Sequence, residues 1–131
     1  EHYMWNFKIY LGKNDRFPEE PASWLKKYPM GTRVILGLTE PLKRYFGDLP
    51  FVIHNDRFFG SPTQCRVVRK LRGCLSNSTC QTNRKGFPAE LVNFKKSTAQ
   101  RGYFKYAMTD ENDVVAICWK DRNVVGFIYI K

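Results

Sequence analysis

The chain has 131 residues, of which 43% are hydrophobic and 15% aromatic, so it can bury a core and is not expected to be disordered. No apolar stretch approaches the ~20 residues of a membrane span, and the first residues lack the basic start and apolar centre of a signal peptide. The formal net charge of +10 favours a polyanionic partner instead of a membrane.

The net positive charge is confined to one part of the chain. Residues 57–105 contain eleven basic side chains and one acidic side chain, whereas the rest of the sequence holds eleven of each. A surface chosen only for solubility would mix the two signs more evenly. We therefore expect nucleic acid, and DNA in particular, to be the partner of this basic segment.

The first part of the chain is predicted to hold a strand, a linker and a helix. Alternating apolar residues over 5–11 indicate a strand, and the prolines of 17–27 are typical of a surface linker. Apolar residues at helical spacing predict a helix over 31–47, where Pro41 is expected to kink it and Gly47 to end it.

A second strand and helix are predicted next. Residues 51–54 form a short apolar run typical of a buried strand, and Asp56 lies just past it, after Asn55. Ser61 is a good N-cap, Pro62 suits the first helical position, and Gly73 suits the helix end. These signals predict a strand, a turn that contains Asp56, and then a helix.

The remainder of the sequence is predicted to be mainly β-structure. A strand is expected within 74–83 and a basic turn at 83–88. Three further β-type runs, at 102–108, 114–119 and 124–130, are joined by short turn-forming segments that suit antiparallel hairpins. The whole pattern predicts an α/β first part and an all-β last part.

Asp56 is a candidate metal ligand, because a carboxylate just past the carboxyl end of a strand lies where α/β sheets place their ligands. Mg²⁺ requires several hard oxygen ligands, which usually come from different elements of the fold. A single aspartate before a Ser-Pro helix start is also a common turn residue. From the residues alone, the turn role is the favoured one.

The four cysteines have no CxxC spacing, and the two histidines lie far apart in the sequence, which argues against a zinc site. Buried reduced thiols are the expected state. The even cysteine count and the sequon at residues 77–79 leave open a small basic secreted protein with two disulfides. Aromatic residues could stack on unpaired bases, but core packing is favoured for Phe58, Phe59, Tyr103, Phe104, Trp119 and Phe127.

The motifs FKIYLGK, GTRVILGLTEPL, FVIHNDRFFGSP, TNRKGFPAEL, RGYFKY and CWKDRNVV follow one another in this order. Together they resemble piggyBac-type transposases and their domesticated relatives. TNRKGFPAEL is the most specific of these motifs, and CWKDRNVV comes next. The order and spacing of the resemblance extend over nearly all of the 131 residues.

The resemblance implies an RNase H-like core fragment at 1–82, with a mixed sheet and flanking helices, followed by a β-rich insertion segment at 83–131. It implies that Asp56 is the second of three aspartates that bind Mg²⁺ or Mn²⁺ in the intact family. The expected partner is DNA and the expected location is the nucleus. A homodimer of the intact protein is left open.

The sequence departs from the family pattern at several points. The first and third aspartates of the family would lie before residue 1 and beyond Lys131, and Arg57 replaces an asparagine. The chain is therefore expected to be a fragment of a transposase catalytic domain that is inactive alone, or else a domesticated non-catalytic DNA-binding module. The candidate DNA contacts are Arg57, Arg66, Arg69, Lys70, Arg84 and Lys85.

Overall fold

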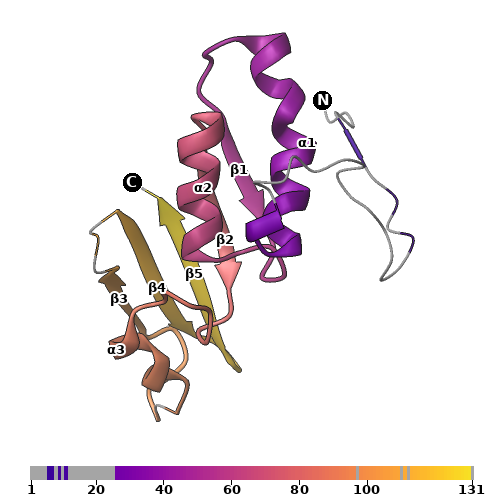
Figure 1. Ribbon diagram of the computed structural model, residues 1–131. Helices are drawn as coiled ribbons and strands as arrows, with labels where there is room; N and C mark the ends of the chain where they lie inside the picture. The colour runs from indigo at the N-terminus through magenta and orange to yellow at the C-terminus, as the bar shows by residue number, and fades with distance from the viewer. Residues whose placement is uncertain are drawn as a thin grey trace. The chain divides into compact units, whose positions relative to one another are not determined.

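The computed structural model describes residues 6, 7, 9, 11, 26–96, 98–109, 111 and 113–130. The chain divides into two compact units, Glu1–Leu49 and Pro50–Lys131 (Figure 1). None of the helices within the described ranges is long and apolar enough to cross a membrane.

The first unit contains helix α1, Met30–Phe46, as its main described element. Its buried side chains recur at helical spacing, at Thr32, Ile35, Leu36 and Thr39. The Thr39 hydroxyl donates to the Ile35 carbonyl at 2.7 Å, so this polar group is satisfied within the helix. The helix continues through Pro41, and Gly47 follows it with a left-handed φ of 64°. The predicted helix and its glycine stop are confirmed, and Pro41 does not divide the helix.

The strand predicted over 5–11 is not seen in the residues that can be compared. Residues 6, 7, 9 and 11 have no strand structure, and the others of that run lie outside the described residues. Most of the predicted linker at 17–27 also lies outside them.

The second unit is built on a five-stranded mixed sheet of order β1-β2-β5-β4-β3. Strands β1 and β2 are parallel, whereas β2–β5, β5–β4 and β4–β3 are antiparallel pairs. The strand bounds are Val52–Asn55 for β1, Leu75–Cys80 for β2, Phe104–Met108 for β3, Val114–Lys120 for β4 and Val124–Ile130 for β5. The strands predicted at 51–54 and within 74–83 are confirmed, as are the antiparallel hairpins of the last three strands and the α/β class.

Helix α2, Pro62–Arg72, connects the parallel strands β1 and β2. The Ser61 hydroxyl accepts a hydrogen bond from the Gln64 amide at 3.0 Å, and Pro62 occupies the first turn. At the other end, Gly73 has a φ of 68° and its amide donates to the Arg69 carbonyl at 2.9 Å. All three punctuation signals of the sequence act as predicted.

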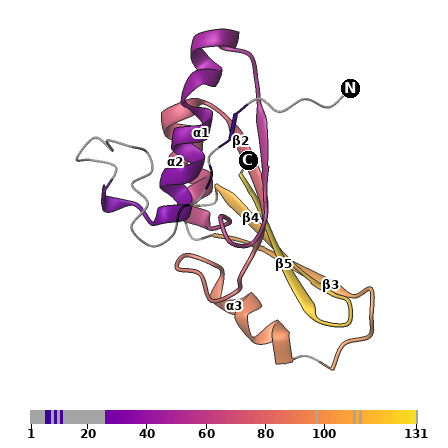
Figure 2. The same cartoon turned by 90° about the vertical axis from the view of Figure 1, so that its right-hand side faces the viewer.

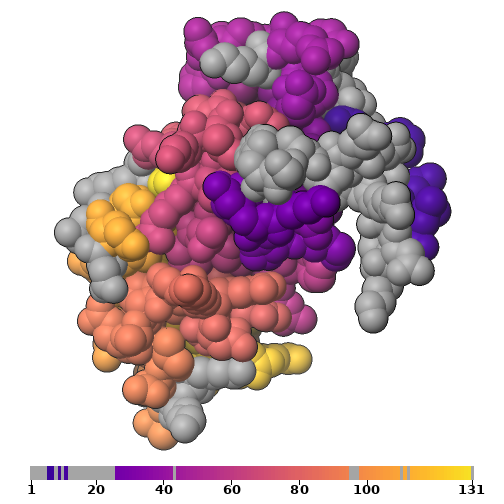
Figure 3. Space-filling view, viewed as in Figure 1, coloured from indigo at the N-terminus to yellow at the C-terminus, as the bar shows by residue number. Residues whose placement is uncertain are grey.

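The helices of the second unit lie on one side of its sheet. Figure 2 shows α2 and α3, Ala89–Val92, on the same side, and in Figure 3 α2 and the segment that carries α3 cover most of the strands on the face in view. A 3₁₀ turn, Asn93–Lys96, follows α3. The core between these layers contains Cys65, Cys80, Phe87, Leu91, Phe94, Ala107, Val114, Ala116, Cys118, Ile128 and Ile130.

One sequence-based expectation needs correction. Strand β1 is not buried, because it is an edge strand in the part of the chain that is described and its Val52 side chain is exposed. The predicted boundary between residues 82 and 83 lies within one sheet, since β5 pairs with β2. The contacts divide the chain into two units at Leu49 and Pro50, and the boundary between core and insertion after residue 82 stays a prediction.

All four cysteines are free and buried, and burial raises the pKa of Cys65 to about 11 and that of Cys80 to about 12. We expect none of the thiols to react with a thiol reagent in the native protein and all four to react in denaturant. Two disulfides would leave no reactive thiol in denaturant and would contradict this expectation.

The thiols favour folding below their unfolded pKa of about 9, and this contribution is lost as the pH rises toward 11 to 12.

Candidate nucleic-acid interface

Asp56 lies immediately after β1, at the edge where the parallel strands β1 and β2 both end. Its carboxylate Oδ1 accepts a hydrogen bond from the Phe58 amide at 2.9 Å, and its carbonyl accepts from the Phe59 and Gly60 amides at 3.1 and 3.0 Å. This is a side-chain-supported turn of the kind that aspartates commonly stabilise. Asp56 is therefore a turn residue whose side chain is also exposed at the carboxyl edge of the sheet.

The basic turn at 82–87 lies next to the Asp56 turn. The Arg84 Nη2 donates to the Phe58 carbonyl at 3.1 Å, and the Cys80 thiol approaches the Gly60 carbonyl at 3.4 Å. Arg57 and Lys85 are exposed on the same two turns. We name these two turns, with Asp56, Arg57, Arg84 and Lys85, the carboxyl-edge cluster.

The N-terminus of α2 belongs to the same edge, because the helix begins directly after the Asp56 turn. Its first turn contains no acidic residue. The amides at a helix N-terminus carry partial positive charge and favour anions. The helix end therefore adds to the positive potential of the carboxyl-edge cluster.

A cluster of hydrogen bonds among the side chains of Asn55, Gln64 and Ser76 holds the strand end and the helix that flank the Asp56 turn. The Ser76 hydroxyl accepts from the Asn55 side-chain amide at 3.1 Å and from the Gln64 side-chain amide at 3.2 Å. Gln64 and Ser76 are almost fully buried, and their mutual hydrogen bonds tie α2 to β2. Sequence reasoning missed this cluster, although Gln64 lies four residues before the core residue Val68 and so on the apolar side of the helix.

Gly60 allows the Asp56 turn to pack directly on β2. A Cβ atom at this position would overlap the Thr79 carbonyl oxygen and would lie 2.8 Å from the Ser78 Cβ. Glycine is thus required at position 60 because the backbone of the Asp56 turn passes too close to the backbone of β2 for a Cβ atom. The sequence feature that could have indicated this role is the position of Gly60 directly before the Ser61-Pro62 start of α2.

Arg66 has a different environment from the carboxyl-edge cluster. Its Nε donates to Asp113 Oδ2 at 2.7 Å and its Nη2 to Asp113 Oδ1 at 2.8 Å, with further contacts from Nη2 to Glu111 and to the Thr109 hydroxyl. These hydrogen bonds lower the pKa of Asp113 to about 2 and raise that of Arg66. Arg66 therefore links α2 to the β3–β4 turn, and we leave it out of the candidate DNA surface.

The structure also separates Arg69 and Lys70 from Asp56. Both are exposed and lie in the last turn of α2. A helix of 11 residues is roughly 16 Å long. Because α2 starts at the carboxyl edge and runs back along the sheet, these two residues face the opposite end from the carboxyl-edge cluster.

A metal centre is not completed by the residues that the structure describes. Within those ranges, no group of three His, Cys, Asp or Glu side chains is placed to hold an ion. The cluster supplies one carboxylate, whereas Mg²⁺ or Mn²⁺ in a two-ion site needs oxygen ligands from several elements. These residues alone do not fit a two-ion centre.

One solved structure matches the fold of this chain. It is the cryo-EM structure of a piggyBac transposase synaptic complex with hairpin DNA, with a TM-score of 0.61, 16% sequence identity and 79% of this chain covered. This chain spans only 20% of the length of that transposase chain. At this identity the match shows a similar fold. No protein-family model and no curated protein matches the chain.

Proposed function

We propose that the chain is part of a piggyBac-like transposase and that it binds DNA through the carboxyl-edge cluster. The observation that carries the proposal is that the fold brings the basic turn at 82–87 against the Asp56 turn. The similarity to a transposase over 79% of the chain supports it, as does the net charge of +10. In this proposal residues 1–82 belong to an RNase H-like core, 83–131 to a β-rich insertion, and the protein acts in the nucleus.

Phosphate groups are the proposed ligands of Arg57, Arg84 and Lys85. The Phe58 carbonyl holds the Arg84 guanidinium in place, so less side-chain freedom is lost when that group meets a phosphate. Contacts of this kind fix the position of the protein on DNA without reading its sequence. We therefore expect affinity without strong sequence preference from this surface.

Asp56 is the proposed metal ligand of the intact protein, in which further carboxylates would complete a site for Mg²⁺ or Mn²⁺. Bound ions would there activate the attacking and leaving oxygens of DNA strand cleavage. For the 131-residue chain we expect DNA binding without cleavage, because a single carboxylate leaves the ions mostly to water.

A second candidate is a non-catalytic DNA-binding module of transposase origin. It is favoured by the turn role of Asp56, whose Oδ1 accepts from the Phe58 amide at 2.9 Å, and by the cation Arg57 beside it. The two candidates share DNA binding and differ in whether Mg²⁺ changes it. Substituting Asp56→Asn separates them, since the amide keeps an acceptor for the turn but loses the negative charge.

The first test is duplex DNA binding measured by fluorescence anisotropy over a series of salt concentrations. We expect Lys85→Gln to weaken binding about three- to tenfold and to reduce the slope of log K against log salt by about one. Lys70→Gln is the matched control, because it removes the same charge from an exposed lysine at the other end of α2. It should change the affinity much less.

Equal effects of the two lysine variants would refute the carboxyl-edge surface and indicate a diffuse charge effect. No binding at low salt by a folded chain would refute DNA binding altogether. If Mg²⁺ strengthens binding by the wild type and not by Asp56→Asn, the metal-ligand role gains support. If Mg²⁺ has no such effect, the module is the better description.

A further inference from the structure

The face of the sheet opposite α2 and α3 carries a group of aromatic side chains. Phe104 and Tyr106 alternate with Lys105 and Ala107 along β3, and Phe104 lies opposite Trp119 on β4. The same face continues through the register to Val125, Phe127 and Tyr129 on β5. We name Phe104, Tyr106, Trp119 and Tyr129 the aromatic face.

These side chains are too exposed to be part of a core. The exposed fraction is 57% for Phe104, 71% for Tyr106, 39% for Trp119 and 41% for Tyr129. The expectation of core packing is therefore wrong for Phe104 and Trp119, and also for Phe58 and Tyr103, which lie outside the strands and are 53% and 50% exposed. For the two strand residues it failed because strand alternation shows that two faces exist and does not show that helices cover only one of them.

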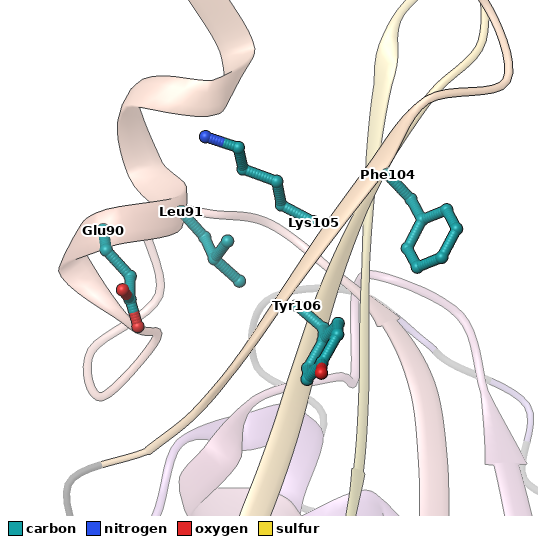
Figure 4. A pocket seen from close by; sticks show the side chains of 5 residues that line it. All are labelled: Glu90, Leu91, Phe104, Lys105 and Tyr106. Carbon is teal, nitrogen blue, oxygen red and sulfur yellow. The ribbon is translucent and has the colours of Figure 1, made fainter.

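The spacing of neighbouring rings along β3 matches two base steps of a stacked strand. Side chains two residues apart on a strand are separated by ~6.8 Å, about twice the ~3.4 Å rise of stacked bases. Figure 4 shows Phe104 and Tyr106 projecting from β3 on one side while Lys105 projects toward α3. A hollow of about 420 Å³ around this edge is lined by Glu90, Leu91, Phe104, Lys105 and Tyr106.

The charges near the aromatic face favour an anionic occupant. Three described acids of this part contact an arginine: Asp121 lies 2.6 Å from Arg101, and Glu111 and Asp113 contact Arg66. Lys105 and Lys120 lie on the face that α2 and α3 cover, but Lys105 lines the hollow at the β3 edge together with Phe104 and Tyr106. Arg122 is exposed in the β4–β5 turn, at the same end of the sheet as Phe104 and Trp119. Glu90 lines the hollow on the α3 side, away from the two projecting rings.

We propose that the aromatic face binds single-stranded nucleic acid, with unpaired bases stacked on Phe104, Tyr106 and Trp119 and phosphates near Lys105 at the β3 edge and Arg122 in the β4–β5 turn. Every base has a π-face, so such a platform accepts any sequence, and the cations neutralise the backbone. The inference rests on the proposed DNA binding and extends it from duplex DNA to single strands. It uses residues distinct from those of the carboxyl-edge cluster.

Two probes separate base stacking from charge. One is a labelled oligothymidylate of about 16 nucleotides, the upper end of the usual site size, and the other is an abasic strand of equal length. Anisotropy should show that the wild-type chain binds oligothymidylate at least tenfold more tightly than the abasic strand. The double variant Phe104→Leu/Tyr106→Leu should lose most of this preference, because leucine keeps apolar area but has no π-face and Trp119 alone of the three rings remains.

Tyr45→Leu is the matched control, because Tyr45 is 68% exposed on α1 and lies outside the aromatic face. It should retain the preference for oligothymidylate. Far-UV circular dichroism confirms that each variant is folded. Phe104→Leu alone should weaken oligothymidylate binding about five- to tenfold and leave duplex binding unchanged.

Three results would overturn the inference. The first is equal wild-type affinity for the two strands, and the second is an unaltered preference in the double variant. The third is concentration-dependent self-association in sedimentation that the double variant abolishes, which would assign the aromatic face to a second copy of the chain. If Lys85→Gln leaves duplex binding unchanged while the double variant loses base preference, the proposed function fails and this inference stands.

Discussion

Replacing Gly60 by alanine is expected to lower the free energy of unfolding by about 3 kcal/mol or more. The added Cβ would meet the Thr79 carbonyl oxygen and the Ser78 side chain, so the Asp56 turn would have to move away from β2. For a domain of this size, that corresponds to a fall in Tm of more than about 12 °C. Thermal unfolding followed by circular dichroism measures it directly.

Gly73→Ala provides the comparison for the Gly60 variant. Its φ is 68°, and no atom lies within 4 Å of the position that a Cβ would take. We expect a loss of only about 1 kcal/mol, from backbone conformation alone. Gly60→Ala/Ser78→Gly should not recover stability, because the nearest obstacle is a backbone carbonyl. Equal losses for the two alanine variants would show that the predicted overlap at Gly60 is relieved at little cost.

Arg66→Ala is expected to cost about 2 kcal/mol of stability. The Arg66 and Asp113 side chains are 26% and 35% exposed, so their ion pair is worth more than a surface pair but less than a fully buried one. Removing Arg66 also takes away one of the two donors to the Thr109 hydroxyl and leaves the Val114 amide at 3.4 Å. Urea unfolding at neutral pH should show the loss, and Arg66→Lys should restore only part of it, because lysine cannot form the bidentate contact.

The pH dependence of the stability lost in Arg66→Ala should identify the Arg66–Asp113 ion pair as the cause of that loss. The pKa of Asp113 falls from 3.8 to about 2 on folding, so its contribution is present above about pH 4 and is lost as the pH falls toward 2. The difference in stability between the wild type and Arg66→Ala should therefore shrink over this interval. Arg69→Ala, at an exposed position of the same helix, should change stability by less than about 0.5 kcal/mol at every pH. A difference that is constant with pH would contradict this account.

The hydrogen bonds of Arg66 to Asp113 and Thr109 are the reason that the proposed interface omits it. Six basic residues were equivalent candidates in the sequence, and only Arg57, Arg84 and Lys85 share an edge with Asp56 in the structure. If Arg66→Ala weakens duplex binding, stability measured in parallel distinguishes partial unfolding from a lost contact. At a temperature where the variant remains folded, we expect its duplex affinity to differ less than that of Lys85→Gln.

Local features of the fold were predictable from the sequence. Ser61, Pro62 and Gly73 mark the ends of α2 because a cap, a first-turn proline and a left-handed glycine act on the backbone within a few residues. The β3–β4 and β4–β5 hairpins follow equally from alternation and short turns. The turn role of Asp56 belongs to this group, since its hydrogen bond spans only two residues.

The remaining features depend on contacts between residues far apart in the chain, and only the tertiary structure decided them. The pairing of β5 with β2 places the predicted boundary at residues 82 and 83 inside one sheet. Arg66 and Asp113 are 47 positions apart, and no local pattern distinguishes Arg66 from the exposed Arg69 on the same helix. The exposed aromatic face likewise depends on which side of the sheet the helices cover, because alternation defines two faces and the packing of α2 and α3 selects the buried one.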